Sequence, residues 1–170
     1  MKNVACIILI IFTVLFAGCN QAAERNTNYV TFYYINNEIK YGTTSGIITS
    51  TVPDLKDVIN DHRKVLEIYF NGPTNYDCIS PFPAGITLED LQVDSSKAEI
   101  LLSPHMATLS GASMTVALAC LTRTVIELTG VDTVDIRIQN NKINGADSIT
   151  LTLNSFLFWD DILEEPTNYH

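Results

Sequence analysis

One segment, at residues 113–130, decides the fold, and it reads SMTVALACLTRTVIELTG. Its apolar residues recur at helical spacing, and Gly130 is suited to end the helix because glycine readily adopts a left-handed backbone conformation. Apart from Arg123 and Glu127, the segment has little polar surface. A helix that is apolar on most sides is buried by more than one neighbour. We therefore expect residues 113–129 to form the central core helix.

A second helix, which is amphipathic, is predicted over residues 53–70. Proline is favoured in the first turn of a helix, and Asp54 and Asp57 suit its positive N-terminal end. Gly72 and the proline after it end the helix. The apolar stripe includes His62, which we expect to be a packed, neutral imidazole. Its members recur at steps of three and four: Leu55, Val58, Ile59, His62, Val65, Leu66, Tyr69 and Phe70.

The remaining segments predict strands, turns and one loop. Residues rich in β-branched and aromatic side chains, or alternating between apolar and polar, are typical of strands. A hairpin is expected where two such runs flank a short turn. The predicted strands are 30–35, 91–93, 98–102, 134–138 and 149–153, with 38–51 as a weak hairpin or irregular insertion and 71–85 as a loop.

These elements follow one another in the order β-α-β-β-α-β-β. Hairpin-linked strands with two intervening helices predict an α+β fold, in which a mainly antiparallel sheet carries both helices on one side. We expect one domain at residues 29–159. A signal peptide at 1–18 and a tether at 19–28 precede it, and an acidic tail at 160–170 follows it.

The N-terminus resembles a bacterial lipoprotein signal. After a short basic start, the run at residues 4–16 is apolar except for Thr13, and it is shorter than the ~20 residues of a spanning helix. The following residues resemble a lipobox, which implies cleavage between Gly18 and Cys19 and a diacylglyceryl group on the Cys19 sulfur. We therefore expect a lipid anchor at the extracytoplasmic face of the cell membrane. The alternative is a plain secretory signal in which Cys19 is accidental.

Few residues suggest catalysis or metal binding. Cys78 and Cys120 can form a disulfide outside the cell, although a buried thiol is favoured for Cys120. Neither histidine nor cysteine occurs at metal-ligand spacing, so we expect no metal and no cofactor. His105 has Ser103 and Ser110 nearby, but a serine nucleophile also needs a strained turn and an orienting acid. We expect no enzyme. The formal charge of -9 also disfavours nucleic acid as a partner.

Several short motifs together resemble GerMN domains, the sporulation and spore germination domains of Gram-positive lipoproteins. Residues 65–73, VLEIYFNGP, are similar to the family's helix ending in Gly-Pro, and residues 83–88, PAGITL, are similar to the stretch that opens its hairpin. Residues 98–103, 110–111, 128–131 and 134–138 follow in the family's order. The resemblance implies a fold similar to ring-building motifs and a non-enzymatic extracytoplasmic role.

Two hypotheses for function remain open. The first is protein–protein assembly at the membrane or cell envelope, with an envelope protein or a second copy as partner. It predicts an exposed apolar strip or an available strand edge. The second is binding of a small ligand, such as a wall fragment or sugar. It predicts a concave pocket lined by some of the following residues: Tyr33, Tyr34, Tyr41, Tyr69, Tyr76 and Trp159.

Overall fold

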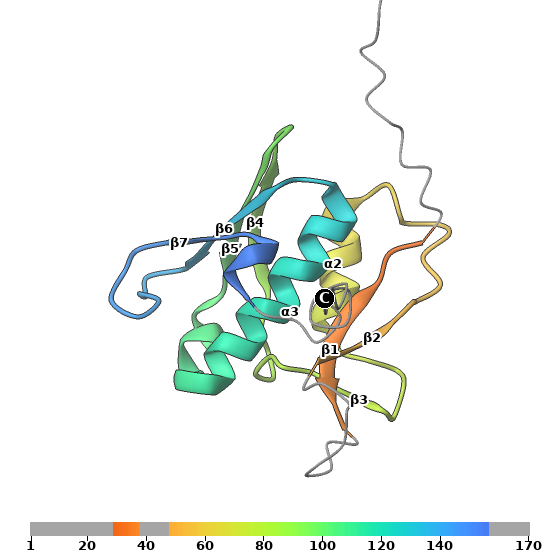
Figure 1. Cartoon of the computed structure of the whole chain (residues 1–170), viewed down its shortest axis with the longest axis horizontal. Coiled ribbons are helices and arrows are strands. Elements are labelled where there is room, and N and C mark those ends of the chain that lie inside the picture. Colours follow the sequence, from red (N-terminus) through yellow and green to blue (C-terminus); the bar gives the residue numbers. More distant parts are fainter. Residues whose placement is uncertain (1–28, 38–47, 157–170) are drawn as a thin grey trace, which may run out of the picture.

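The strands form two sheets, which the computed structural model describes over residues 29–37 and 48–156 (Figure 1). The smaller sheet is antiparallel and has the order β2-β1-β3, and the larger has the order β4-β5-β6-β7. Among the strands in these two ranges, β5 and β6 are the one parallel pair. The α+β class is confirmed, with the strands divided between two sheets. The strands are β1 (Phe32–Asn36), β2 (Ile48–Thr51), β3 (Cys78–Ile79), β4 (Leu88–Val93), β5 (Lys97–Leu102), β6 (Thr133–Ile138) and β7 (Ile149–Leu151).

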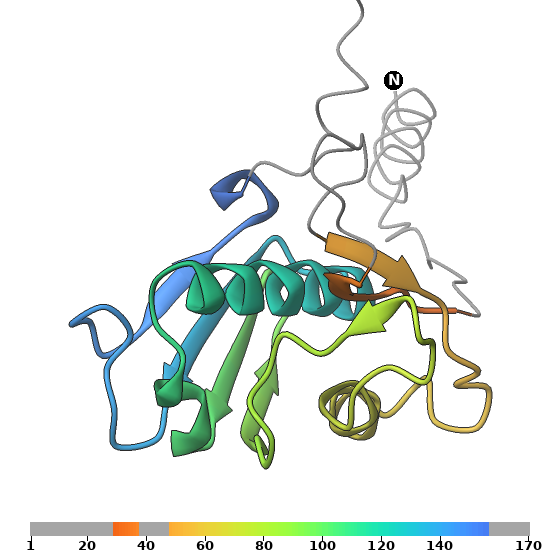
Figure 2. The same ribbon diagram turned by 90° about the horizontal axis from the view of Figure 1, so that it is seen from below.

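The helix α3 (Gly111–Thr129) is the central core helix, as predicted. It contacts β6 of the larger sheet and β1 of the smaller one, and Figure 2 shows it lying along the four-stranded sheet. Its buried residues face more than one direction. The composition of α3 would allow it to span a membrane, but here these residues pack inside the fold. Gly130 ends it with φ +75°, a left-handed conformation that favours glycine.

The helix α2 (His62–Phe70) is shorter than predicted, because it does not extend back to Pro53. Asp61 has φ -103° and ψ 86°, which is not helical, and its side chain accepts the backbone N–H of Lys64 at 3.1 Å. The Asp61 side chain therefore caps the helix and sets its start at His62. The apolar periodicity of the sequence runs through this point without a break. His62, which the sequence predicts to be a packed imidazole, lies in the first turn of α2 and is half-buried.

Residues before α2 reach the core without forming the predicted helix. The N–H groups of Val58 and Ile59 both donate to the Leu55 carbonyl at 2.9 Å, which makes isolated turns. Leu55 is buried all the same. The apolar spacing therefore predicted the burial of Leu55 correctly. The start of the helix was determined instead by the polar side chain of Asp61.

The four-stranded sheet buries one face against α3. The predicted hairpin is β4 and β5, and β6 then pairs in parallel with β5 after the chain has passed through η1 (Pro104–Thr108) and α3. The alternating pattern is confirmed, since every second residue is buried in both central strands. These are Ala98, Ile100 and Leu102 in β5 and Val134, Ile136 and Ile138 in β6.

Aromatic side chains fill the space between the smaller sheet and α2. Phe32 and Tyr34 on β1 lie 5.0 Å and 5.1 Å from the Tyr69 ring, measured between centroids, and Phe82 lies 5.2 Å from it. The Tyr34 hydroxyl donates to the Tyr69 carbonyl at 3.1 Å. The short strand β3, within the segment predicted as a loop, completes this sheet. The second 3-10 turn, η2 (Leu153–Ser155), follows β7.

Candidate functional site

The predicted anchor cannot be placed in the fold. Gly18 and Cys19 lie outside the described residues, and so do the tether at 19–28 and the acidic tail at 160–170. The same holds for two of the aromatic residues proposed for a ligand pocket, Tyr41 and Trp159. The structure therefore bears on function through the domain alone.

Both cysteines of the domain are buried free thiols. Cys78 lies on β3 and Cys120 within α3, and no disulfide joins them. Burial raises the pKa of Cys120 to about 12 and raises the pKa of Cys78 as well. A thiol acts as a nucleophile or metal ligand only when it is ionised. Cys120 is therefore a small apolar core residue, as expected.

Ser103 and His105 lie close to each other, but their arrangement is structural. The distance between Ser103 Oγ and His105 Nδ1 is 3.5 Å, and Ser103 Oγ also accepts the Thr87 N–H at 3.0 Å. Ser103 is buried, whereas His105 is exposed on η1. Within residues 29–37 and 48–156, no carboxylate side chain bonds to His105. The serine hydroxyl ties β4 to the end of β5, and no orienting acid completes a triad there.

Metal ligands are not gathered in the described part of the chain. No three His, Cys, Asp or Glu side chains there are placed to hold a metal ion. Carboxylates on the outward face of the four-stranded sheet form ion pairs with lysine and arginine side chains instead. Lys97 Nζ lies 2.9 Å from Glu99 and 3.2 Å from Asp135, and Arg137 lies 3.3 Å from Glu99.

Two of the tyrosines proposed for a ligand pocket, Tyr34 and Tyr69, contact each other inside the core, with ring centroids 5.1 Å apart. Tyr34 and Tyr69 are core residues, and each has a hydroxyl that donates to a backbone carbonyl. Tyr76 is 93% exposed. The Tyr33 hydroxyl donates to Glu127 at 2.8 Å, and the Arg123 guanidinium lies 4.6 Å from the centre of its ring. Burial, together with this bond to Glu127, raises the pKa of Tyr33 to about 12.

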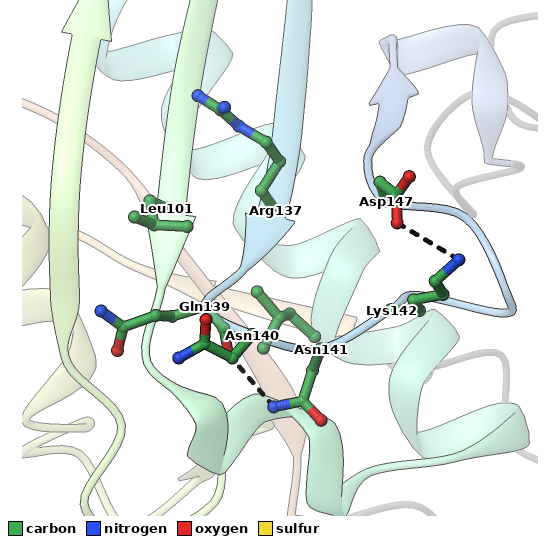
Figure 3. A pocket seen from close by; sticks show the side chains of 8 residues that line it. Leu101, Arg137, Gln139, Asn140, Asn141, Lys142 and Asp147 are labelled. Carbon is green, nitrogen blue, oxygen red and sulfur yellow. Dashed lines mark hydrogen bonds and ion pairs between the residues drawn. The ribbon is translucent and has the colours of Figure 1, made fainter.

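A polar hollow of about 500 Å³ lies at the end of β6 (Figure 3). All three charged side chains in its lining are already paired, since Lys142 Nζ lies 3.3 Å from Asp147 and the Arg137 guanidinium lies 3.3 Å from Glu99. None of the proposed tyrosines lines it. Its lining residues are Leu101, Arg137, Ile138, Gln139, Asn140, Asn141, Lys142 and Asp147.

A second, more apolar hollow of about 360 Å³ lies between the smaller sheet and the N-terminal half of α3. Residues of three segments line it, including Ile35, Phe82 and Val116. The tyrosines of the ligand hypothesis are absent from this lining too.

The free edges of the two sheets differ in charge. β4 carries Glu89 and Asp90, and the guanidinium of Arg63 on α2 donates to the Leu88 carbonyl on that strand at 2.9 Å. β3 has only two residues and follows Asp77. β7 has three residues and begins two residues after Asp147.

β2 is the exception among the described edges. It pairs with β1 alone, and its sequence ITST carries no charge. Val52, which follows it, is an exposed apolar residue at 57% exposure. A free edge of this kind is a template for another strand. The β-branched residues of 48–52 were the available sequence signal, but the sequence predicted no more than a weak hairpin here.

Comparisons with known proteins agree with the arrangement of the elements. A family model described as Germane, sporulation and spore germination, matches residues 31–144. The first GerMN domain of the sporulation protein GerM from Bacillus subtilis has 15% identity and a TM-score of 0.54, over 74% of this chain and 96% of that one. No curated protein matches.

The tandem GerMN domains of the same Bacillus subtilis protein give 14% identity and a TM-score of 0.56. That alignment covers 75% of this chain and 47% of the tandem protein, so this chain spans about half of its length. At these identities the structural likeness shows the fold, and the family model supplies the membership. The chain belongs to the Germane family of sporulation and spore germination proteins, and its fold is that of a GerMN domain.

Proposed function

We propose that this protein is a lipid-anchored, extracytoplasmic GerMN lipoprotein that acts without catalysis, through protein–protein assembly at the membrane or cell envelope. The observation that carries the assembly role is the uncharged free edge of β2 on an otherwise acidic chain. A strand edge binds another chain through main-chain hydrogen bonds and needs no enzymatic constellation. The family's link to sporulation and germination supports a role at the envelope.

The anchoring part of the proposal rests on the lipobox-like residues that end at Cys19. Two acyl chains hold a protein on a membrane stably, since each buried methylene contributes ~0.8 kcal/mol. We expect Cys19→Ala to shift the protein from the detergent phase to the aqueous phase in detergent extraction, or to leave it unprocessed. Cys78→Ala, which changes a cysteine of the domain, is the control and keeps the membrane partition. An unchanged partition of Cys19→Ala would refute the anchor.

The assembly part is tested by crosslinking on intact cells, followed by identification of the proteins joined to the anchored chain. Recovery of a defined complex, with a second copy or with an envelope protein, is the expected result. The Cys19→Ala variant is the matched control, because its domain is unchanged while its membrane location is lost. If the wild type gives no crosslinked species at any crosslinker concentration, the assembly role is wrong.

Small-ligand binding is the second candidate function, and the polar hollow at the end of β6 is the feature that favours it. Its amide side chains have the donors and acceptors that sugar hydroxyls need. A soluble wall fragment that binds there would raise the melting temperature of the wild type and not that of Gln139→Ala. If the fragment causes no shift in the wild type, this alternative is excluded for that ligand.

A further inference from the structure

The hydrogen bonds of β1 determine which backbone groups β2 presents outward. The Tyr33 N–H donates to Thr124 Oγ1 at 3.1 Å, and the Tyr33 carbonyl accepts from the Tyr69 hydroxyl at 2.7 Å. Both backbone groups of Tyr33 are thus used by helix side chains, on the side of β1 away from β2. In an antiparallel pair, alternate residues direct both groups toward the neighbouring strand or away from it. Ser50, which lies opposite Tyr33, therefore directs its N–H and carbonyl away from β1.

The same alternation applies two residues to either side. Ile48 lies opposite Ile35, which is itself paired with β3 on the far side of β1, so Ile48 also presents its backbone groups outward. Val52 continues the spacing beyond Thr51. Pro53 then ends the edge, because proline has no N–H to offer. Residues 48–52 thus form a short row of donors and acceptors that no described strand binds.

Charge distinguishes the β2 edge from the other edges of the two sheets. The chain has a formal charge of -9, so two copies repel each other wherever acidic surfaces meet. β4, the longest of the other edges, carries Glu89 and Asp90, which would face like charges in a second copy. Residues 48–52 carry none. Within the described part of the chain, this edge is where backbone pairing between two copies meets the least repulsion.

We propose that β2 is a self-association surface at which the β2 strands of two copies pair antiparallel across a two-fold axis. This inference rests on the proposed assembly function and names its partner as a second copy of this chain. The pairing would join the two three-stranded sheets into one continuous sheet. Because such an interface is self-complementary, each residue meets the same contact in both copies.

The outward groups fix the register of this pairing. When Ser50 faces Ser50 of the second copy, Ile48 faces Val52 of the second copy, and all three outward residues form hydrogen-bonded pairs. Thr49 then faces Thr51 of the second copy. Cross-strand pairs of β-branched residues and of threonines are favourable in sheets. Every side chain in the paired region is uncharged.

Charge substitution at the two-fold axis tests the pairing. Ser50 is exposed, so both Ser50→Glu and Ser50→Lys leave the packed core untouched. Each variant places like charges opposite each other, and we expect the dissociation constant of the dimer to rise by about tenfold or more. An equimolar mixture of the two variants places opposite charges there, so we expect it to regain wild-type association. Sedimentation of the full chain over a range of concentrations gives the constants.

Two controls separate strand pairing from effects of the anchor and of charge alone. All variants keep Cys19, so any clustering through the lipid is the same in each. Gln92→Glu and Gln92→Lys change an exposed residue on the edge strand β4, and we expect them to associate like the wild type. Ser50→Cys should form a disulfide-linked dimer on oxidation, because facing residues in such a pair lie about 5.5 Å apart between Cα atoms.

The inference is overturned if the wild type stays monomeric at all concentrations, or if the mixture of charge variants associates no better than either alone. Crosslinking on intact cells then distinguishes this failure from failure of the proposed function. Recovery of a different envelope protein by a monomeric chain would refute self-pairing and leave the assembly role standing. Absence of any crosslinked species would refute both.

Discussion

Thr124 and Tyr69 complete the hydrogen bonding of β1 where β3 ends. β3 pairs with the last two residues of β1, so none of the described strands lies beside Tyr33 on that side. The hydroxyls of the two helices bind its N–H and carbonyl instead. Buried backbone groups need such partners, because an unpaired one loses its bonds to water without replacement. Thr124 on α3 and Tyr69 on α2 therefore replace a neighbouring strand as hydrogen-bond partners of Tyr33.

A pair of threonines on α3 tests this role. Thr124→Val removes the acceptor of the Tyr33 N–H, and we expect it to lower the free energy of unfolding by about 1–3 kcal/mol. Thr122 is equally buried, but its hydroxyl has no hydrogen-bond partner in the described structure. Thr122→Val should therefore be neutral or stabilising. Urea unfolding measures both variants, and equal losses of stability would contradict the role of Thr124.

At the scale of elements, the start of α2 shows where apolar periodicity stops being informative. The stripe of residues 55–70 is continuous, yet the backbone is interrupted at Asp61. Its carboxylate accepts an N–H of the first helical turn, which competes with continuation of the helix from the preceding residues. Periodicity reports which side chains are buried, and a capping side chain determines where the helix begins.

Two aspartates distinguish the predicted helix start from the observed one. Asp61→Ala removes the cap, so we expect it to reduce the free energy of unfolding by about 1 kcal/mol. Asp57→Ala changes an exposed residue in the turns before the helix, and we expect a much smaller effect. Chemical denaturation of the two variants gives the comparison. A larger loss for Asp57→Ala would favour a helix that begins near Pro53.

At the scale of the whole molecule, several buried or half-buried tyrosine and cysteine side chains have raised pKa values. Burial raises the pKa of Tyr33 and of Cys120 to about 12, and it raises those of Tyr34 and Tyr69 as well. An acid with a raised pKa stays protonated in the fold while the unfolded chain loses its proton. Stability from these groups is therefore complete below the ordinary pKa of 9.0 for cysteine and 10.0 for tyrosine, and it falls as pH rises toward the folded values.

The free energy of unfolding should accordingly decrease as pH rises from about 8 to about 11. Tyr33→Phe removes one contributing group, so the decrease in that variant should be smaller than in the wild type. Tyr76→Phe is the control, because the Tyr76 side chain is 93% exposed. We expect this variant to show the same decrease in the free energy of unfolding as the wild type. Urea unfolding at several pH values gives the slopes. A stability that rises over this range would contradict the prediction.

The family and much of the fold could be predicted from the sequence. The central helix, the β4–β5 hairpin and the alternation in β6 all follow from local spacing, since side chains of one element face one side at a fixed period. The short strand β3 could not be predicted, because two residues carry no periodicity. The candidate edge at β2 could not be predicted either, because only the strand order of the folded chain shows that β2 has a described neighbouring strand on one side alone.

The sequence by itself determined the α+β class, the central position of α3, the GerMN resemblance and the candidate anchor at Cys19, since each depends on residues close together in the chain. Tertiary structure alone decided the division into two sheets, the burial of Tyr34 and Tyr69 in the core, and the outward direction of the Ser50 backbone. These depend on contacts between residues distant in the chain. The direction of Ser50, for example, follows from Thr124 on α3 binding the strand beside it.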